Sequence, residues 1–414
     1  MPQTVHIIGA GMAGLAAAVR LAGRGVATVI HEATDQAGGR CRSYDDAASG
    51  MRIDNGTHIL LSANTAALGF LASIGATDRV IGAASARFPF VDLATKERWT
   101  LDLGTGRLPF WVFDRHRRAP GTRALDYVAL ARLLWPTPDQ PLAQVISCTG
   151  PAYEQVVRPF LLAALNVDPS ASSSDLARAV VRESIALGGS ACRPYLAPKG
   201  LSAAFVEPAM AYLKGHAGAF RFGNQLHRLV VATDTVTGLD FGGGAMAVGP
   251  DDAVVLAVPP YVASALVLDL RTPDAFCAII NAHFRIVPPP GLEPMVGVLN
   301  GVAEWIFGFE DRISVTISGA DRFLPHSRDE IAKMIWHDVQ RVADVPAELP
   351  PWQIVRERRA TFAATPAQNA KRPGARTAWR NLMLAGDWTD TGLPATIESA
   401  VRSGNRAADL VMQQ

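Results

Sequence analysis

The first thirty residues contain a glycine pattern that few folds accommodate. A β-rich run, Val5-His6-Ile7-Ile8, leads directly into Gly9-Ala10-Gly11-Met12-Ala13-Gly14. An alanine- and leucine-rich helix follows, and then a second strand over residues 27–31 that ends at Glu32. The order of strand, glycine turn, helix, strand and acid is typical of a dinucleotide site on a Rossmann-type α/β fold.

Each residue of this turn has an expected role in binding a dinucleotide. Gly9 permits the tight turn, Gly11 lets the backbone approach a pyrophosphate, and Gly14 lets the helix pack on the strand. Met12 and Ala13 begin the helix, whose free N–H groups and partial positive charge would face the phosphates. Glu32, with Ala33 beside it, follows at the spacing of an acid that binds a ribose hydroxyl. The alternative is a glycine-rich turn in an unrelated α/β protein.

A second glycine pair follows the acid, in the stretch "EATDQAGGRCRS". With Gly38, Gly39 and Arg40 in this place, the chain resembles the glutathione-reductase-type flavoproteins of the amine oxidase and phytoene desaturase group. The resemblance implies that these three residues help to hold FAD. Arg40 and Arg42 could otherwise be ordinary solvated charges.

The next segment, "RIDNGTHIL", carries Asn55, Gly56, Thr57 and His58. The resemblance places it beside the flavin ring. Its alternative interpretation is a strand edge with a hydrogen-bonded histidine.

The C-terminal stretch "LMLAGDWTDTGLPATIESAVRSG" predicts the other half of the same site. A strand over 382–385 would end at Gly386 and Asp387, where ligands bind in open α/β sheets. Leu393 and Pro394 would turn the chain into a helix that begins near Ala395 and Thr396. The resemblance implies that Asp387 contacts the ribityl–pyrophosphate part of FAD and that the helix N-terminus stabilises the reduced flavin.

The middle of the chain predicts a discontinuous cofactor domain. Alternating residues over 225–240 predict a β-meander, and 253–258 predict a buried strand that ends at Pro259-Pro260. By resemblance this part returns to FAD at the adenine end, with Val230 and Ala257 as contacts. We expect an FAD-binding domain over 1–75, 195–265 and 380–414. A mixed α+β substrate domain would take 76–194 and 266–379.

Three middle segments resemble one branch of the group. "RPFLLAALNVDPSASSSDLARAVVRES", "YLAPKGLSAAF" and "AEWIF" are similar to the squalene-associated hydroxysqualene dehydroxylases of bacterial hopanoid biosynthesis. One departure is at Gly200-Leu201, where related desaturases often have a further glycine. The branch implies reductive loss of the hydroxyl of hydroxysqualene, with hydride passing from reduced flavin N5 to an allylic cation.

The acid that protonates the leaving hydroxyl has two candidates. His58 is the first, because an ordinary histidine pKa lies near neutrality. Glu398 is the second, with helix capping or a cofactor contact as its alternative role.

The same motifs are compatible with other functions. A carotenoid desaturase would use oxidised FAD, and an amine oxidase would need a polar or aromatic cage. A non-catalytic isoprenoid-lipid escort on a GDI-like scaffold would need no functional flavin. The electron donor is unknown, since no second GxGxxG unit for a pyridine nucleotide is present.

Composition limits the partners and the compartment. A net charge of +1 argues against a nucleic-acid binder, and four widely spaced cysteines predict reduced thiols and no metal site. No signal peptide is visible, and Pro259-Pro260 interrupt the longest apolar run, so we expect a cytoplasmic protein with an apolar C30 isoprenoid substrate.

One segment raises the question of membrane contact. "LPFWVFDRHRRAP" places Phe110, Trp111 and Phe113 beside Arg115, Arg117 and Arg118. Aromatic and basic residues together can dock at the inner face of an anionic membrane. The alternative is a core strand followed by a solvated turn.

Overall fold

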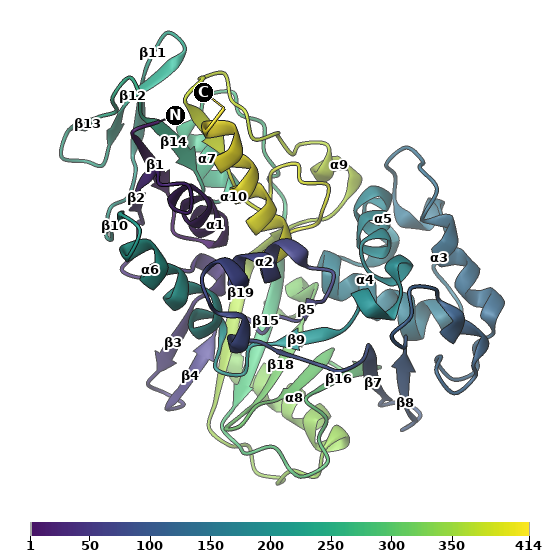
Figure 1. The fold of residues 1–414 in the computed structure, drawn as a ribbon. Helices are drawn as coiled ribbons and strands as arrows, with labels where there is room; N and C mark the ends of the chain where they lie inside the picture. Colours follow the sequence, from purple (N-terminus) through teal and green to yellow (C-terminus); the bar gives the residue numbers. More distant parts are fainter. Residues whose placement is uncertain (1, 414) are drawn as a thin grey trace.

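A computed structural model describes residues 2–413, apart from the side chains of Ala129 and Leu130 (Figure 1). Its first sheet is parallel throughout and has five strands. In spatial order these are β10 (Gly218–Arg221), β2 (Ala27–His31), β1 (Thr4–Ile8), β14 (Ala253–Leu256) and β20 (Leu382–Leu384). Strands from the beginning, middle and end of the chain therefore lie side by side.

Helices cover both faces of this parallel sheet. On one face a core forms with α1 (Met12–Ala22), α2 (Thr65–Ser73), α6 (Glu207–Lys214) and α10 (Ile397–Val411). On the other face, Leu256 and Leu384 pack in a second core with α7 (Pro260–Leu266). The short α9 (Pro366–Asn369) precedes β20.

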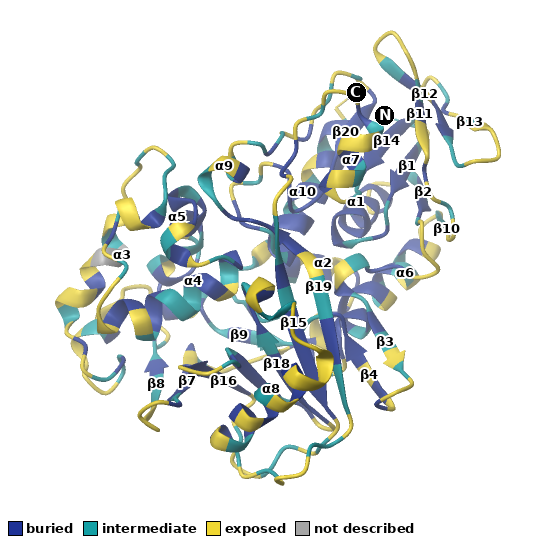
Figure 2. Ribbon diagram, turned by 180° about the vertical axis from the view of Figure 1, so that it is seen from behind, coloured by how far each residue is buried: buried dark blue, intermediate teal, exposed yellow. Residues whose placement is uncertain are grey.

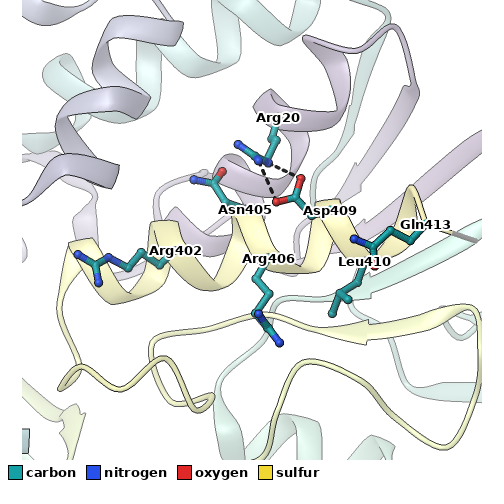
Figure 3. A pocket seen from close by; sticks show the side chains of 7 residues that line it. All are labelled: Arg20, Arg402, Asn405, Arg406, Asp409, Leu410 and Gln413. Atoms are coloured by element: carbon teal, nitrogen blue, oxygen red, sulfur yellow. Dashed lines mark hydrogen bonds and ion pairs between the residues drawn. The ribbon is translucent and has the colours of Figure 1, made fainter.

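The two terminal helices approach each other closely at one glycine. A Cβ on Gly404 of α10 would lie 2.1 Å from the carbonyl oxygen of Ala13 in α1. Arg20 of α1 also donates from Nε and Nη2 to the two carboxylate oxygens of Asp409 in α10, each at 2.8 Å (Figure 3). The C-terminal helix is thus fixed against the helix that starts at the glycine turn.

The second large sheet has seven strands and is mostly antiparallel, with one parallel pair between β16 and β7. Its spatial order is β19 (Trp352–Phe362), β15 (Phe276–Phe284), β18 (Ile313–Ile317), β17 (Trp305–Gly308), β16 (Met295–Leu299), β7 (Arg87–Asp92) and β8 (Arg98–Asp102). The amphipathic α8 (Arg328–Val342) covers one face with a core of its own.

The opposite face of the seven-stranded sheet shares the second core with the parallel sheet. Phe88 and Phe307 belong to the same buried cluster as Leu256 and Leu384. A lobe with α3 (Val128–Arg132), α4 (Arg158–Leu165) and α5 (Ser174–Arg182) closes this side (Figure 1). One continuous core therefore joins the two sheets.

Three small sheets complete the fold. β3 (Ser43–Asp46) pairs with β4 (Met51–Asp54), and β9 (Pro194–Leu196) lies between β5 (Leu60–Leu61) and β6 (Ile81–Gly82). The expected meander is β11 (Arg228–Ala232), β12 (Thr235–Asp240) and β13 (Ala245–Ala247).

The fold class is confirmed, and one local expectation is wrong. The chain has a Rossmann-type parallel sheet and a second, mixed unit; the exact domain boundaries stay a prediction. The core strand that was considered near residue 110 as the alternative to membrane contact is instead a 3₁₀ turn, Phe110–Phe113, in which only Trp111 is buried. Leu108 and Phe113 fall outside the core, so this apolar segment does not form a core strand. The four cysteines are free thiols.

Among the described residues, no helix combines the length and the apolar character that a membrane span needs.

Candidate flavin site

The glycine turn between β1 and α1 is shaped by close backbone contacts. Gly9 has φ +104°, and a Cβ there would lie 2.5 Å from the carbonyl oxygen of Ala257. A Cβ on Gly14 would lie 1.9 Å from the carbonyl oxygen of Gly9. At Gly11, by contrast, a Cβ would meet nothing within 4 Å. Two glycines are therefore required by packing, and the middle one faces open space.

The first turn of α1 supplies donors at this open space. Gly11 is the N-cap residue and makes no side-chain capping bond, and the first turn holds no acidic residue. Met12 and Ala13 are buried. A buried helix N-terminus without a side-chain cap is an anion-binding site, since its N–H groups and its dipole both favour negative charge.

Glu32 is oriented toward the glycine turn. Its Oε2 accepts the Ala10 N–H at 2.8 Å, and its Oε1 accepts the N–H and hydroxyl of Thr34, each at 2.9 Å. These bonds fix the carboxylate at the end of β2, where a ribose is expected. Ala33, next to it, is exposed.

The second glycine pair packs on the first. The Gly38 N–H donates to the Ala10 carbonyl at 2.8 Å, and Gly38 forms an isolated parallel bridge with Gly11. Gly38 and Gly39 have φ +109° and +56°, and a Cβ on Gly39 would lie 3.2 Å from the Gly11 Cα. The two glycine-rich segments thus form one backbone-lined surface.

The C-terminal turn joins this surface through an ion pair that the sequence did not predict. Arg40 Nη2 donates to both oxygens of the buried Asp387, at 2.7 and 2.8 Å. Arg40 also donates to the carbonyl oxygen of Ala360. Asp387 follows Gly386, whose N–H donates to Ser403 Oγ of α10 at 2.9 Å. Residues almost 350 positions apart are therefore in contact (|i−j| = 347).

Comparisons with known proteins decide the family. The model of the family described as flavin containing amine oxidoreductase matches residues 12–412. The chain belongs to this family. It is 55% identical over 413 residues to a hydroxysqualene dehydroxylase of Rhodopseudomonas palustris, covering 100% of this chain and 99% of the relative. A hydroxysqualene dehydroxylase of Sinorhizobium fredii is 52% identical, with the same coverage.

Solved structures of amine oxidases share the fold. Cyclohexylamine oxidase from Brevibacterium oxydans IH-35A superposes with a TM-score of 0.74 at 17% identity, over 100% of this chain and 99% of that one. A putrescine oxidase variant superposes with a TM-score of 0.70, also at 17% identity, over 99% of each chain. This flavin-containing family uses FAD, so the protein is an FAD-dependent oxidoreductase.

The residues of the site fit this cofactor. The open space at Gly11 and the uncapped start of α1 suit a pyrophosphate, and Glu32 is placed for a ribose. Ala257 lies against Gly9 at the same turn, and its contact with the adenine end of FAD stays a prediction. Val230 lies half-buried on β11 and pairs with Gly238 of β12, and its cofactor contact stays a prediction.

Residues 55–57, which are expected beside the flavin, are anchored to the seven-stranded sheet by Asn281, which sequence reasoning missed. Asn281 Oδ1 accepts the Thr57 N–H at 3.3 Å, and its Nδ2 donates to the Asn55 carbonyl at 3.3 Å. A Cβ on Gly56 would lie 3.2 Å from that Nδ2. Asn281 is 1% exposed, so this amide fixes the height of residues 55–57 above the sheet.

The pKa of His58 differs from the near-neutral value on which its choice as the acid depended. Burial, and then the positive charge of Arg40, lower its pKa to about 4. The imidazole is neutral at pH 7, so the reason for choosing it as the acid, a pKa near neutrality, is wrong.

Glu398 has a capping role in the structure. Its two oxygens accept the N–H groups of Ala66 and Ala67, at 3.1 and 2.8 Å, in the first turn of α2. Arg402 Nε also donates to it at 2.8 Å. With both oxygens engaged and 2% of the residue exposed, its role as a proton donor has no support in these contacts.

The start of α10 differs slightly from the expectation. The helix begins at Ile397, and Thr396 is its N-cap, whose hydroxyl accepts the Ser399 N–H. Leu393 and Pro394 are buried, and Ala395 is half-buried. The expected turn is therefore present, and the helix after it begins at Ile397, two residues later than Ala395.

A buried arginine, Arg372, holds the turn after β20. Its Nη2 donates to the carbonyl oxygens of Asp387 and Thr389, at 3.3 and 2.5 Å. Its guanidinium carbon lies 4.9 Å from the centre of the Phe362 ring, and burial lowers its pKa to about 10. The stretch "NAKRPG" gave no signal that this arginine would be buried, because the carbonyls it bonds lie 15 to 17 residues away.

A surface pocket of about 400 Å³ is lined by Arg20 of α1 and by residues of α10 and the chain end that follows it (Figure 3). None of the expected cofactor contacts lines it. Its lining residues are Arg20, Arg402, Asn405, Arg406, Asp409, Leu410 and Gln413.

Proposed function

We propose that the protein reductively removes the hydroxyl group of hydroxysqualene and releases squalene, as a step of bacterial hopanoid biosynthesis. The observation that carries the proposal is the 55% identity, over the full length of both chains, to a relative of that name. Reduced FAD, when bound, supplies the hydride that replaces the hydroxyl. One proton is also consumed, and the hydroxyl leaves as water.

The apolar face of the seven-stranded sheet supports a hydrocarbon substrate. Phe88, Phe90, Trp305 and Phe307 are all buried in the core on the side of this sheet that also carries Asn281. An allylic cation is destroyed by water, so a wall without solvated polar groups protects it until hydride arrives.

The residues expected to lie near the flavin act by positioning the backbone and the side chains around it. Asn281 fixes the Asn55–Thr57 backbone, and Arg372 fixes the turn that presents Asp387. The neutral His58 can offer one hydrogen bond to a hydroxyl without placing a second positive charge beside Arg40.

Anaerobic turnover tests the proposal. The flavin-loaded protein is reduced chemically, mixed with hydroxysqualene, and the products are analysed by mass spectrometry. We expect squalene in proportion to the reduced flavin supplied. Oxidised protein is tested with phytoene in parallel, and desaturated phytoene in the absence of any squalene would instead favour a carotenoid desaturase.

Two further measurements distinguish the dehydroxylase from an amine oxidase and from a lipid escort. Reduction of the flavin by a panel of amines would favour an amine oxidase. Purified protein without a flavin absorption spectrum, and without affinity for added FAD, would favour a lipid escort.

A further inference from the structure

Exposed apolar side chains are concentrated in one lobe of the molecule. Of the fourteen large hydrophobic residues that are exposed in the described part of the chain, seven lie between residues 108 and 135. They are Leu108, Phe110, Phe113, Leu125, Val128, Leu134 and Trp135. Single exposed apolar residues are normal on a protein surface, but a group of this kind marks an interaction site. We call residues 104–136 the α3 lobe.

The aromatic residues of the α3 lobe are held outward by an ordered turn. Phe110 and Phe113 are 67% and 73% exposed, whereas Trp111 between them is 2% exposed. Trp111 packs edge-on against Tyr127, with ring centres 5.1 Å apart. Arg118 Nη1 donates to the Val112 carbonyl at 2.7 Å. The buried indole anchors the turn, so folding itself leaves the two phenylalanines in solvent.

The charge of the α3 lobe is strongly positive. Residues 104–136 contain six arginines and two aspartates, in a chain whose net charge is only +1. Within residues 2–413, Arg107, Arg115, Arg123 and Arg132 are exposed and form no ion pair with a carboxylate. Exposed aromatic residues among unpaired arginines match a surface with anionic headgroups above a hydrocarbon layer.

We propose that the α3 lobe docks the protein on an anionic lipid bilayer, with the aromatic residues inserted and the arginines at the headgroups. The lobe lies on the side of the molecule farthest from β11–β13 and the chain termini, as both ribbon views show (Figures 1 and 2). Docking there leaves the glycine turn of the flavin site away from the membrane. The purpose of docking rests on the proposed function, since hydroxysqualene and squalene both dissolve in a bilayer.

Vesicle binding tests the docking surface. The flavin-loaded full-length protein is sedimented with vesicles of phosphatidylcholine, with and without phosphatidylglycerol. We expect binding to the anionic vesicles that weakens as salt is added. Phe110→Ser with Phe113→Ser should lower the partition coefficient by at least about tenfold, because two inserted rings are lost. Arg115→Gln with Arg132→Gln should lower it by roughly tenfold as well.

A matched control uses exposed apolar residues elsewhere. Leu268 and Val287 are 83% and 72% exposed and lie outside the α3 lobe. Leu268→Ser with Val287→Ser should bind vesicles as the wild type does. Equal binding by the Phe110→Ser, Phe113→Ser protein would overturn the proposal. So would a dimer, seen by sedimentation without vesicles, that this variant abolishes, because the surface would then join two copies of the chain.

Fluorescence locates the inserted residues. Trp135 is 65% exposed, so lipids brominated on their acyl chains should quench part of the tryptophan emission of the wild type. Trp135→Phe should still bind and lose this quenching. Unchanged quenching in the variant would place the contact elsewhere.

An activity assay in detergent separates the proposed function from the proposed docking surface. With hydroxysqualene dispersed in detergent, the Phe110→Ser, Phe113→Ser protein should be as active as the wild type. If neither protein forms squalene, the proposed function fails, while the vesicle result still decides the docking surface.

Discussion

Asp387 is the residue on which the two ends of the chain converge. It accepts two hydrogen bonds from Arg40 and follows the strand that closes the parallel sheet. We predict that Asp387→Ala lowers FAD affinity by about tenfold or more, because a charged acceptor is lost and Arg40 is left unpaired. The measurement is the flavin-to-protein absorbance ratio after purification, followed by titration of the apoprotein with FAD.

Asp387→Asn provides the control for this residue. The amide keeps one acceptor for Arg40 and removes the charge, so its affinity should lie between those of the wild type and the alanine variant. Full flavin occupancy in Asp387→Ala would rule out this role of Asp387. Truncation before Gly386 should abolish flavin binding, because it also removes α10.

At the scale of elements, Glu398 links α10 to α2. Asn64, the N-cap of α2, makes no side-chain capping bond, and Glu398 instead accepts two N–H groups of the first turn. We predict that Glu398→Ala lowers the free energy of unfolding by about 2 to 3 kcal/mol, since two buried donors lose a charged acceptor. Urea unfolding measures this loss.

The glutamine variant separates capping from catalysis. Glu398→Gln keeps one acceptor for α2, so it should lose about 1 kcal/mol and retain activity within tenfold. A stable Glu398→Gln protein without activity would restore Glu398 as the proton donor.

Elements with local signals were predicted from the sequence, whereas contacts between distant segments were not. The strands over 4–8, 27–31, 253–256 and 382–384 follow from short β-rich runs next to glycine or proline. Asn281 and Arg372 gave no such signal, because their roles depend on backbone groups that only the folded chain brings near. The turn at 110–113 was missed because a run of apolar residues does not show which of them point into the core and which into solvent.

At the scale of the whole molecule, histidines with lowered pKa values make the stability depend on pH; His31 and His283 are buried and His58 is half-buried. Burial lowers the pKa of His31 and His58 to about 4 and that of His283 to about 3. In the unfolded chain these groups titrate near 6.5, so between pH 6.5 and 4 the unfolded state binds more protons. The histidines therefore contribute stability above pH 6.5 that is lost on acidification.

The carboxyl of Glu304 has the opposite effect on how stability depends on pH. Burial raises the pKa of Glu304 to about 7, so the folded state holds its proton where the unfolded state has released it. Burial also lowers the pKa of His6 and raises that of Asp54, so four histidines against two carboxyls leave a net uptake of roughly two protons on unfolding near pH 5.5. The free energy of unfolding should then fall by roughly 3 kcal/mol for each pH unit of acidification in this window.

His283 offers the sharpest test of this pH dependence. It is 1% exposed, and its ring nitrogens lie 2.8 Å from Ser314 Oγ and 3.0 Å from the Asp54 carbonyl oxygen. His283→Asn removes one titrating group, so the slope of stability against pH should fall by about 1.4 kcal/mol per unit. Ser314→Ala removes a hydrogen-bond partner and no titrating group, so it should lower stability at every pH and leave the slope unchanged. Urea unfolding at pH 5, 6 and 7 compares the three proteins, and equal slopes for the wild type and His283→Asn would mean that His283 is already protonated in the folded state.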